Sequence, residues 1–188
     1  MFLDIVIPKK GEEEKFVEVA KLLGTKGLIF IYGELDRINL KKVKAFSSKD
    51  FFVKTGFIMK DLKNISGLKK DFDYLFSNGE RAHIENKHTD FVFETEKTNP
   101  KDSMHYRNSG INQIHAKLLK EKNIVFCFSF NEVLNASDKP KIFGRMMQNV
   151  MIAKKYKIKT LFASFARNPM ELRSKKDLET FGRCMGFD

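Results

Sequence analysis

The sequence predicts an α/β protein in which a mostly parallel sheet is covered by helices. Short apolar runs rich in Ile, Val and Phe alternate along the 188-residue chain with segments of helical periodicity. The apolar runs lack polar alternation, as expected for strands that are buried on both faces. Seven runs are expected to be strands: Leu3–Ile7, Gly27–Tyr32, Phe51–Met59, Phe72–Phe76, Asp90–Phe93, Ile124–Phe130 and Thr160–Phe165.

Helical segments follow most of the predicted strands. We expect the first at Glu12–Leu23, because apolar side chains recur there at helical spacing, its leading glutamates suit the positive end of the helix dipole, and a glycine follows it. Shorter helices are expected at Leu40–Phe46 and 80–88. The last helix is predicted at Ser174–Met185, with Ser174 in position to cap it.

Two further helices, Gly110–Lys120 and 141–155, have clear apolar faces. The residues expected to point inward are Ile111, Ile114, Leu118 and Leu119 in the first, and Phe143, Met146, Met147, Val150 and Met151 in the second. Lys117 points away from the first face. Arg145 and Asn149, four residues apart, are expected together on the solvent side of the second helix.

Two architectures accommodate seven parallel strands in a chain of this length. One is a (β/α) barrel, although that fold typically needs roughly 250 residues, and the other is an open doubly wound sheet. The polar stretch 95–104 lacks periodicity and is expected to be a mobile connection. No linker or repeat divides the chain, so residues 1–188 are expected to form a single domain.

Positive charge is concentrated in the second part of the chain. The formal net charge is +11, of which residues 1–100 carry +2 and residues 101–188 carry +9. Such a surface suits nucleic acid or an anionic membrane, although a lysine-rich solvated surface gives the same count. No segment reaches the ~18 apolar residues that would span a bilayer, and the N-terminus lacks the features of a signal peptide. We therefore expect a cytoplasmic protein without a membrane partner.

Signatures of a self-contained catalytic centre are missing from the sequence. There is no P-loop, G-x-G-x-x-G or G-x-S-x-G motif, and the histidines form neither H-x-H nor H-E-x-x-H. His83 and His88 are expected to be exposed, and His115 to lie at the edge of a core. Glu94 and Glu96 end the fifth strand, where a solvated rim is favoured over acid–base chemistry. We therefore expect neither catalytic residues nor a metal site.

Short motifs follow one another in a fixed order between residues 105 and 186. They are Arg107 with Gly110-Ile-Asn-Gln, Phe128-Ser129, Arg145-Met with Asn149, Ala163-Ser-Phe-Ala166, Leu172-Arg173-Ser174, Asp177-Leu178 and Met185-Gly186. In order and spacing this segment resembles the archaeal and eukaryotic ribonuclease P protein component 3 family. The first hundred residues match that family only in outline. The chain departs from the family at Phe165, where a small residue is typical.

The resemblance implies a distorted TIM-like (β/α) barrel, related to the PHP phosphoesterases, that acts as an RNA-binding subunit of ribonuclease P. In that family the RNA carries the catalytic metal ions, so we expect no cofactor on this chain and magnesium on the RNA subunit. The implied partners are ribonuclease P RNA, precursor tRNA, protein component 2 and other ribonuclease P proteins. The chain would then support removal of the 5′ leader from precursor tRNA without cutting RNA alone.

Basic side chains near the junctions of strands and helices are the candidate RNA contacts, because a guanidinium is a planar fork that fits phosphate oxygens. Arg107 precedes a helix N-terminus, which also favours phosphate, although an ion pair with Asp102 is the alternative. Arg173 has the alternative of pairing with Asp177. The full set expected to bind RNA is Arg107, Arg145, Arg173, Lys117, Arg81 and Arg167.

The sequence predicts recognition of RNA shape and phosphates, because no aromatic cluster resembles a platform for stacking bases. Two other functions stay open. One is a stand-alone PHP-type metal-dependent phosphoesterase, which would need paired histidines where the first strand instead ends in Val6-Ile7-Pro8. The other is a barrel-shaped scaffold that binds only proteins.

Overall fold

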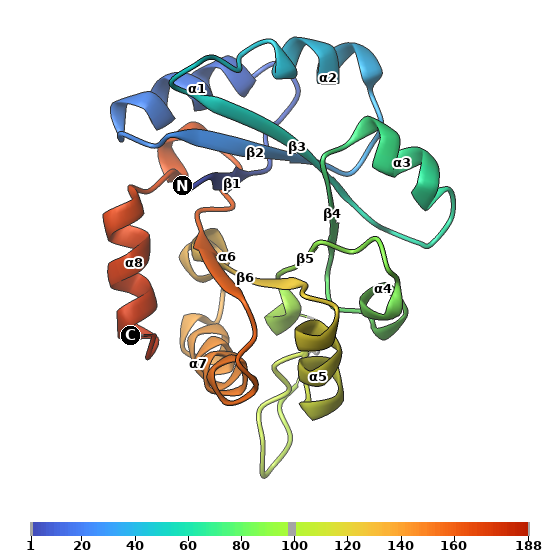
Figure 1. Cartoon of the computed structure of the whole chain (residues 1–188). Helices are drawn as coiled ribbons and strands as arrows, with labels where there is room; N and C mark the ends of the chain where they lie inside the picture. The colour runs from blue at the N-terminus through green and yellow to red at the C-terminus, as the bar shows by residue number, and fades with distance from the viewer. Residues whose placement is uncertain (1, 98–100, 188) are drawn as a thin grey trace.

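Seven parallel strands form one sheet whose spatial order is the chain order, in a computed structural model that describes residues 2–97 and 101–187 (Figure 1). The strands are Asp4–Val6 (β1), Gly27–Tyr32 (β2), Phe52–Ile58 (β3), Tyr74–Ser77 (β4), Phe91–Val92 (β5), Val125–Ser129 (β6) and Thr160–Ala163 (β7). Each lies inside or next to a predicted run, so the predicted strands and their parallel direction are confirmed.

Eight α-helices surround the strands in the described part of the chain (Figure 1). They are Glu13–Leu22 (α1), Arg37–Lys44 (α2), Ile65–Asp71 (α3), Arg81–Glu85 (α4), Gln113–Glu121 (α5), Phe130–Asn135 (α6), Lys139–Tyr156 (α7) and Lys175–Cys184 (α8), with 3-10 turns at Thr95–Lys97 (η1) and Pro169–Glu171 (η2). The six predicted helices are present, whereas α3 and α6 were not predicted.

Each missed helix lacks the signal on which the prediction relied. In α3 only Ile65 is buried, so no apolar stripe marks it. The apolar run of β6 continues into α6 without a break, but Ser129 ends the strand, because its Oγ accepts a hydrogen bond from the Glu132 backbone at 3.1 Å and caps the helix. The expected mobile connection contains η1, and its residues 98–100 lie outside the described residues.

The sheet curves until its last strand meets its first, which confirms the barrel and excludes the open doubly wound sheet. Val6 of β1 forms a parallel bridge with Ala166, just beyond β7. The Ile7 N–H donates to the Ala166 carbonyl at 2.8 Å. Because backbone pairing between β1 and β7 is limited to this bridge within the described residues, the barrel needs a further connection to stay closed.

A buried carboxylate supplies that connection. Asp4 is fully buried in β1, and its Oδ1 accepts a hydrogen bond from the Ser164 N–H at 2.7 Å, while the Ser164 hydroxyl donates to Oδ2 at 2.5 Å. The same hydroxyl oxygen accepts from the Arg173 N–H at 3.0 Å. Burial raises the pKa of Asp4 to about 6, although its hydrogen bonds with Ser164 and Ile5 lower it. Asp4 therefore joins the barrel seam to the connection that leads to α8.

The barrel interior is filled by apolar side chains, so the barrel is a core and not a channel. Phe93 and Phe165 stack near the C-terminal ends of the strands, with ring centroids 5.1 Å apart. Phe165 adopts a positive φ of 47°, which is uncommon for a bulky residue, and its side chain is fully buried. The departure from the family pattern at this position is therefore absorbed inside the barrel.

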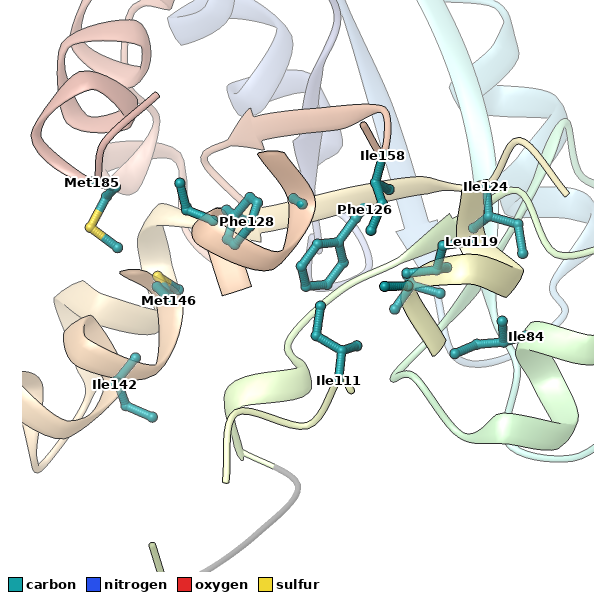
Figure 2. Packing of buried hydrophobic residues seen from close by; sticks show 14 residues of the cluster. Ile84, Ile111, Leu119, Ile124, Phe126, Phe128, Ile142, Met146, Ile158 and Met185 are labelled. Atoms are coloured by element: carbon teal, nitrogen blue, oxygen red, sulfur yellow. The ribbon is translucent and has the colours of Figure 1, made fainter. Parts of the chain in front are cut away.

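A second apolar cluster joins the outside of β6 to the helices. Figure 2 shows Phe126 and Phe128 of β6 near Leu119 of α5 and Met146 of α7. Cys127, between the two phenylalanines, belongs to the interior cluster instead. This alternation fixes α5 and α7 against the same strand, and it thereby sets the distance between the two helices.

The predicted faces of these two helices need correction. Arg145 and Asn149 of α7 are buried, whereas Met151, predicted to point inward, is 72% exposed. Met147 is also exposed, and so is Ile114 of α5. The reason is that the connection between β5 and α5 covers one side of α7 with polar groups, so Arg145 and Asn149 find partners there and apolar spacing alone misplaces the face.

Removing the Asp4 carboxylate is expected to weaken the barrel seam. Asp4→Ala leaves the Ser164 N–H and hydroxyl without their acceptor, so the free energy of unfolding should fall by about 2–4 kcal/mol. Asp4→Asn keeps an amide oxygen for the N–H and should lose less than half of that. Urea unfolding at pH 7.5 measures both, and equal stability of Asp4→Ala and the native chain would contradict this role.

Candidate nucleic-acid interface

The predicted arginines all lie on segments that follow the C-terminal ends of β4 to β7, the end of a (β/α) barrel that carries functional sites. They are Arg81 at the start of α4, Arg107 before α5, Arg145 in α7, and Arg167 and Arg173 between β7 and α8; Lys117 lies on the exposed surface of α5. The topology thus brings the arginines to one half of the barrel, while their individual environments differ.

Arg145 points into the protein and is only 1% exposed. Its Nε donates to Oδ1 of Asp102 at 2.8 Å, and Nη1 donates to the backbone carbonyl of Glu96 at 2.6 Å. The prediction of a solvent-facing Arg145 is wrong, because these two partners reach over α7 and satisfy the guanidinium internally. In this position Arg145 has no open surface for an RNA phosphate, and it instead anchors the segment that carries Arg107.

Asn149 and Gln148 fasten the same segment from the next turn of α7. The fully buried Asn149 donates through Nδ2 to Glu96 Oε1 at 2.7 Å and to the Ser109 carbonyl at 2.9 Å. Gln148 donates to the Arg107 carbonyl and to Ser109 Oγ, both at 3.0 Å. The family-pattern residues Arg145 and Asn149 therefore act together on the chain that leads to Arg107.

Arg107 is exposed, and its guanidinium lies across a glycine of α7. A Cβ atom built at Gly144 would overlap Arg107 Nη1, so only glycine allows this close approach. The alternative ion pair with Asp102 is absent from the described residues, because Asp102 pairs with Arg145 at 2.7 Å. Arg107 thus remains available to an anion, and Gly144 leaves room for its guanidinium beside α7.

A groove of about 710 Å³ opens beside Arg107, between the segment 106–112, the start of α5 and α7. Its walls include Tyr106, Gln148 and Lys155. Asn112 caps α5, because its Oδ1 accepts from the backbone N–H groups of Ile114 and His115. The roles of Tyr106, Gly144 and Lys155 were not predicted, since nothing in their local sequence pattern shows that α7 faces this segment.

The connection between β7 and α8 forms a second basic area, around the seam. The Arg173 guanidinium lies 5.3 Å from the Phe130 ring centroid, and its Nη1 donates to the carbonyls of Met170 and Leu172. The alternative ion pair between Arg173 and Asp177 is absent from the described residues, since the Asp177 carboxylate accepts from Ser174. Arg173 is therefore held by neutral groups and keeps its full charge for a ligand.

The other predicted basic residues are more exposed. Arg167 is 56% exposed and lies 3.4 Å from Glu94 Oε1, while its backbone N–H donates to Glu171 at 2.8 Å, so it braces its loop as well. Arg81 pairs with Glu85 at 2.7 Å across one helical turn. Exposed pairs of this kind contribute little stability and are readily exchanged for a phosphate. Lys117 forms no ion pair with any described residue.

The expected solvated rim of Glu94 and Glu96 at the barrel mouth needs correction, because Glu96 is buried and the Glu94 side chain is only 15% exposed. Glu96 is fully buried and Glu132 is 2% exposed. Burial raises the pKa of Glu96 to about 7, although its hydrogen bond with Asn149 opposes the shift. Burial, and then the charge of Glu96, raise the pKa of Glu132 to about 8. Both carboxyl oxygens of Glu132 lack a hydrogen-bond partner among the described residues. A proton on this side chain therefore removes an uncompensated negative charge from the barrel mouth.

The four histidines lie on segments that follow β4 and β5 and have different surroundings. His83, expected to be exposed, is buried with Nδ1 3.2 Å from Ser77 Oγ. His105 is exposed on the segment before Arg107, and His115 is half-buried on α5 as predicted. Burial lowers the pKa of His115, so its neutral form is favoured. Over residues 2–97 and 101–187, no group of three His, Cys, Asp or Glu side chains is placed to hold a metal ion.

The fold and this site define a class: a seven-stranded (β/α) barrel whose basic residues follow strands β4 to β7. No family model matches the sequence. The chain is similar to a chain in a cryo-EM structure of archaeal ribonuclease P with mature tRNA, with a TM-score of 0.76 and 22% identity, over 97% of this chain and 82% of that chain. A crystal structure of an uncharacterized protein is similar at a TM-score of 0.56 and 9% identity, over 97% and 69% of the respective chains. These likenesses show the shared barrel fold.

None of the helices in the described ranges is both long and apolar enough to cross a membrane.

The pKa of Glu132 predicts how stability depends on pH. Between its ordinary value of 4.5 and about 8, the folded chain holds a proton that the unfolded chain releases, so the free energy of unfolding falls as pH rises. Glu132→Gln imitates the protonated acid and should be more stable than the native chain by roughly 1–3 kcal/mol at pH 8.5, with little difference at pH 5. Thermal unfolding measures this, with the exposed Glu34→Gln as control; a gain for Glu132→Gln that is equal at both pH values would contradict it.

Proposed function

We propose that this chain is an RNA-binding protein subunit of ribonuclease P, and that it supports the catalytic RNA in removing the 5′ leader from precursor tRNA. The observation that carries the proposal is the convergence of the motif residues. Arg107, Gly110, Arg145 and Asn149, up to 42 positions apart in the sequence, meet in one network. The fold likeness to a chain in archaeal ribonuclease P supports the same conclusion.

The basic residues take two different roles in this proposal. Arg107, Arg173, Arg167, Arg81 and Lys117 offer charge at the surface and are proposed to bind RNA phosphates. Arg145 is a positioning residue, because it holds the segment before Arg107 from the inside. We further propose that the RNA subunit holds the magnesium ions and performs the cleavage, and that protein component 2 and the other ribonuclease P proteins bind elsewhere on the barrel.

Replacing Arg107 tests the phosphate contact. Arg107→Ala should weaken binding to ribonuclease P RNA and reduce the slope of log affinity against log salt by about 0.7–0.9, the value for one lost phosphate contact. Filter binding at several salt concentrations measures the slope, and reconstituted precursor-tRNA cleavage measures function. Lys15→Ala, on the exposed surface of α1, is the matched control. Unchanged slope and cleavage for Arg107→Ala would reject this assignment.

Replacing Gly144 tests the position of Arg107 while the charge is retained. Gly144→Ala displaces the guanidinium from its place against α7 but keeps its charge, so RNA affinity should fall, although by less than in Arg107→Ala. Stability should not fall, because alanine favours a helix interior over glycine by ~1 kcal/mol and the long Arg107 side chain can move away. Binding and thermal unfolding measured together decide the matter: lost stability with unchanged RNA affinity would show that the glycine serves the fold alone.

A bound metal ion would distinguish the stand-alone phosphoesterase from the proposed RNA subunit. Stoichiometric zinc or manganese in the purified chain, together with phosphatase activity in the absence of RNA, would establish the phosphoesterase and overturn the RNA subunit. Neither the barrel mouth nor the histidines provide a specific observation in favour of that activity.

A further inference from the structure

The groove beside Arg107 contains groups that phosphate binding alone does not use. Two tyrosines line it, Tyr106 from the segment before α5 and Tyr156 from the end of α7. Tyr106 is 64% exposed, so its ring is accessible to a ligand. The volume of about 710 Å³ falls within the range of roughly 300–1,000 Å³ that small-ligand sites occupy. A concave site with aromatic walls suits a planar group that enters from outside.

Polar groups in the same groove are free to bind the edge of such a planar group. Gln113 is exposed at the first turn of α5, and its amide forms no hydrogen bond with the described residues. An amide offers both a donor and an acceptor, as the edge of a nucleobase does. Lys155 lies 5.8 Å from the Tyr156 ring centroid, so positive charge stands beside the aromatic wall.

The walls of the groove are fixed before any ligand binds. Gln148 donates to the Arg107 carbonyl and to the Ser109 side chain, and Asn149 donates to the Ser109 carbonyl, so the backbone is held on both sides of Asn108. Gly110 keeps a positive φ of 88° and comes too close to the Thr95 carbonyl for any side chain. Tyr106 is thereby presented next to Arg107 on a backbone that is already ordered, which lowers the entropic cost of binding.

We propose that this groove binds one unpaired nucleotide of an RNA, with the base stacked on Tyr106 and the phosphate on Arg107; this rests on the proposed function as an RNA subunit. A paired base is turned toward its partner strand and cannot enter a concave site, whereas a bulged or loop base can. The groove therefore adds recognition of a base to the shape and phosphate recognition that the sequence predicts, because its two aromatic walls come from distant segments.

Three hairpin RNAs distinguish recognition of the base from recognition of the phosphate. The first carries a single-nucleotide bulge, the second carries an abasic nucleotide at the bulge, and the third is fully paired. The native chain should bind the bulged hairpin roughly tenfold more tightly than the abasic one, the effect of one base stacking on one aromatic ring. Tyr106→Ala should abolish this difference, and Tyr106→Phe should retain it. Arg107→Ala should weaken binding to the bulged and abasic hairpins by the same factor.

The outcomes distinguish the groove from the wider proposal. Equal affinity for the bulged and abasic hairpins, or a difference that survives in Tyr106→Ala, would overturn the base site. Salt-dependent binding of all three RNAs would in that case still support the RNA subunit. Failure to bind any of the three hairpins would overturn the RNA subunit, and the base site with it. Circular dichroism of Tyr106→Ala and Tyr106→Phe verifies that each variant is folded.

Discussion

The Asp4 carboxylate is the contact on which the closed barrel depends. Seven strands in chain order leave β1 and β7 to meet, yet backbone pairing there is a single bridge between Val6 and Ala166 in the described residues. The carboxylate accepts one hydrogen bond from the Ser164 backbone N–H and one from the Ser164 hydroxyl. These two short bonds take the place of the further backbone pairing that would otherwise join β1 to β7. Since the Ser164 hydroxyl oxygen also accepts from the Arg173 backbone, closing the barrel places the basic connection before α8 in the same step.

Helix α7 fixes the second basic segment, the one that carries Arg107 before α5, because its polar residues point inward and bind that segment. A buried arginine is costly unless its partners satisfy it, and here Asp102 and the Glu96 carbonyl do so. The main effect of this network is to fix the position of the segment between β5 and Arg107, because each hydrogen bond holds a different part of that segment. Glu96 is bonded to this network through Asn149, and Glu132 is buried near it, so this end of the barrel holds two buried acids whose pKa values burial raises.

Most of the fold could be predicted from local pattern, whereas the site could not. Apolar runs such as Gly27–Tyr32 and the Ser174 cap depend on neighbours in the sequence, and the structure confirms them. The sequence also holds Arg145 and Gly144, but their roles depend on Asp102 and Arg107, which are about forty residues away and carry no periodic signal. Helical spacing therefore assigned Arg145 to solvent, although Arg145 and Arg107 both belong to the motifs that carry the family resemblance.

The filled barrel also explains why the proposed RNA contacts lie on the connections and helices that follow the strands, and not inside the barrel. Stacked rings of Phe93 and Phe165 occupy the place where a barrel enzyme of this class would admit a substrate. What remains for a ligand is the surface formed by the connections and the outer helices, where Arg107 stands on Gly144 beside an open groove. A large polyanion needs this geometry, because it rests against a wide rigid surface and sends at most a single protruding group into a depression. The buried network beneath Arg107 is thus the feature that positions the proposed RNA contact on the closed barrel.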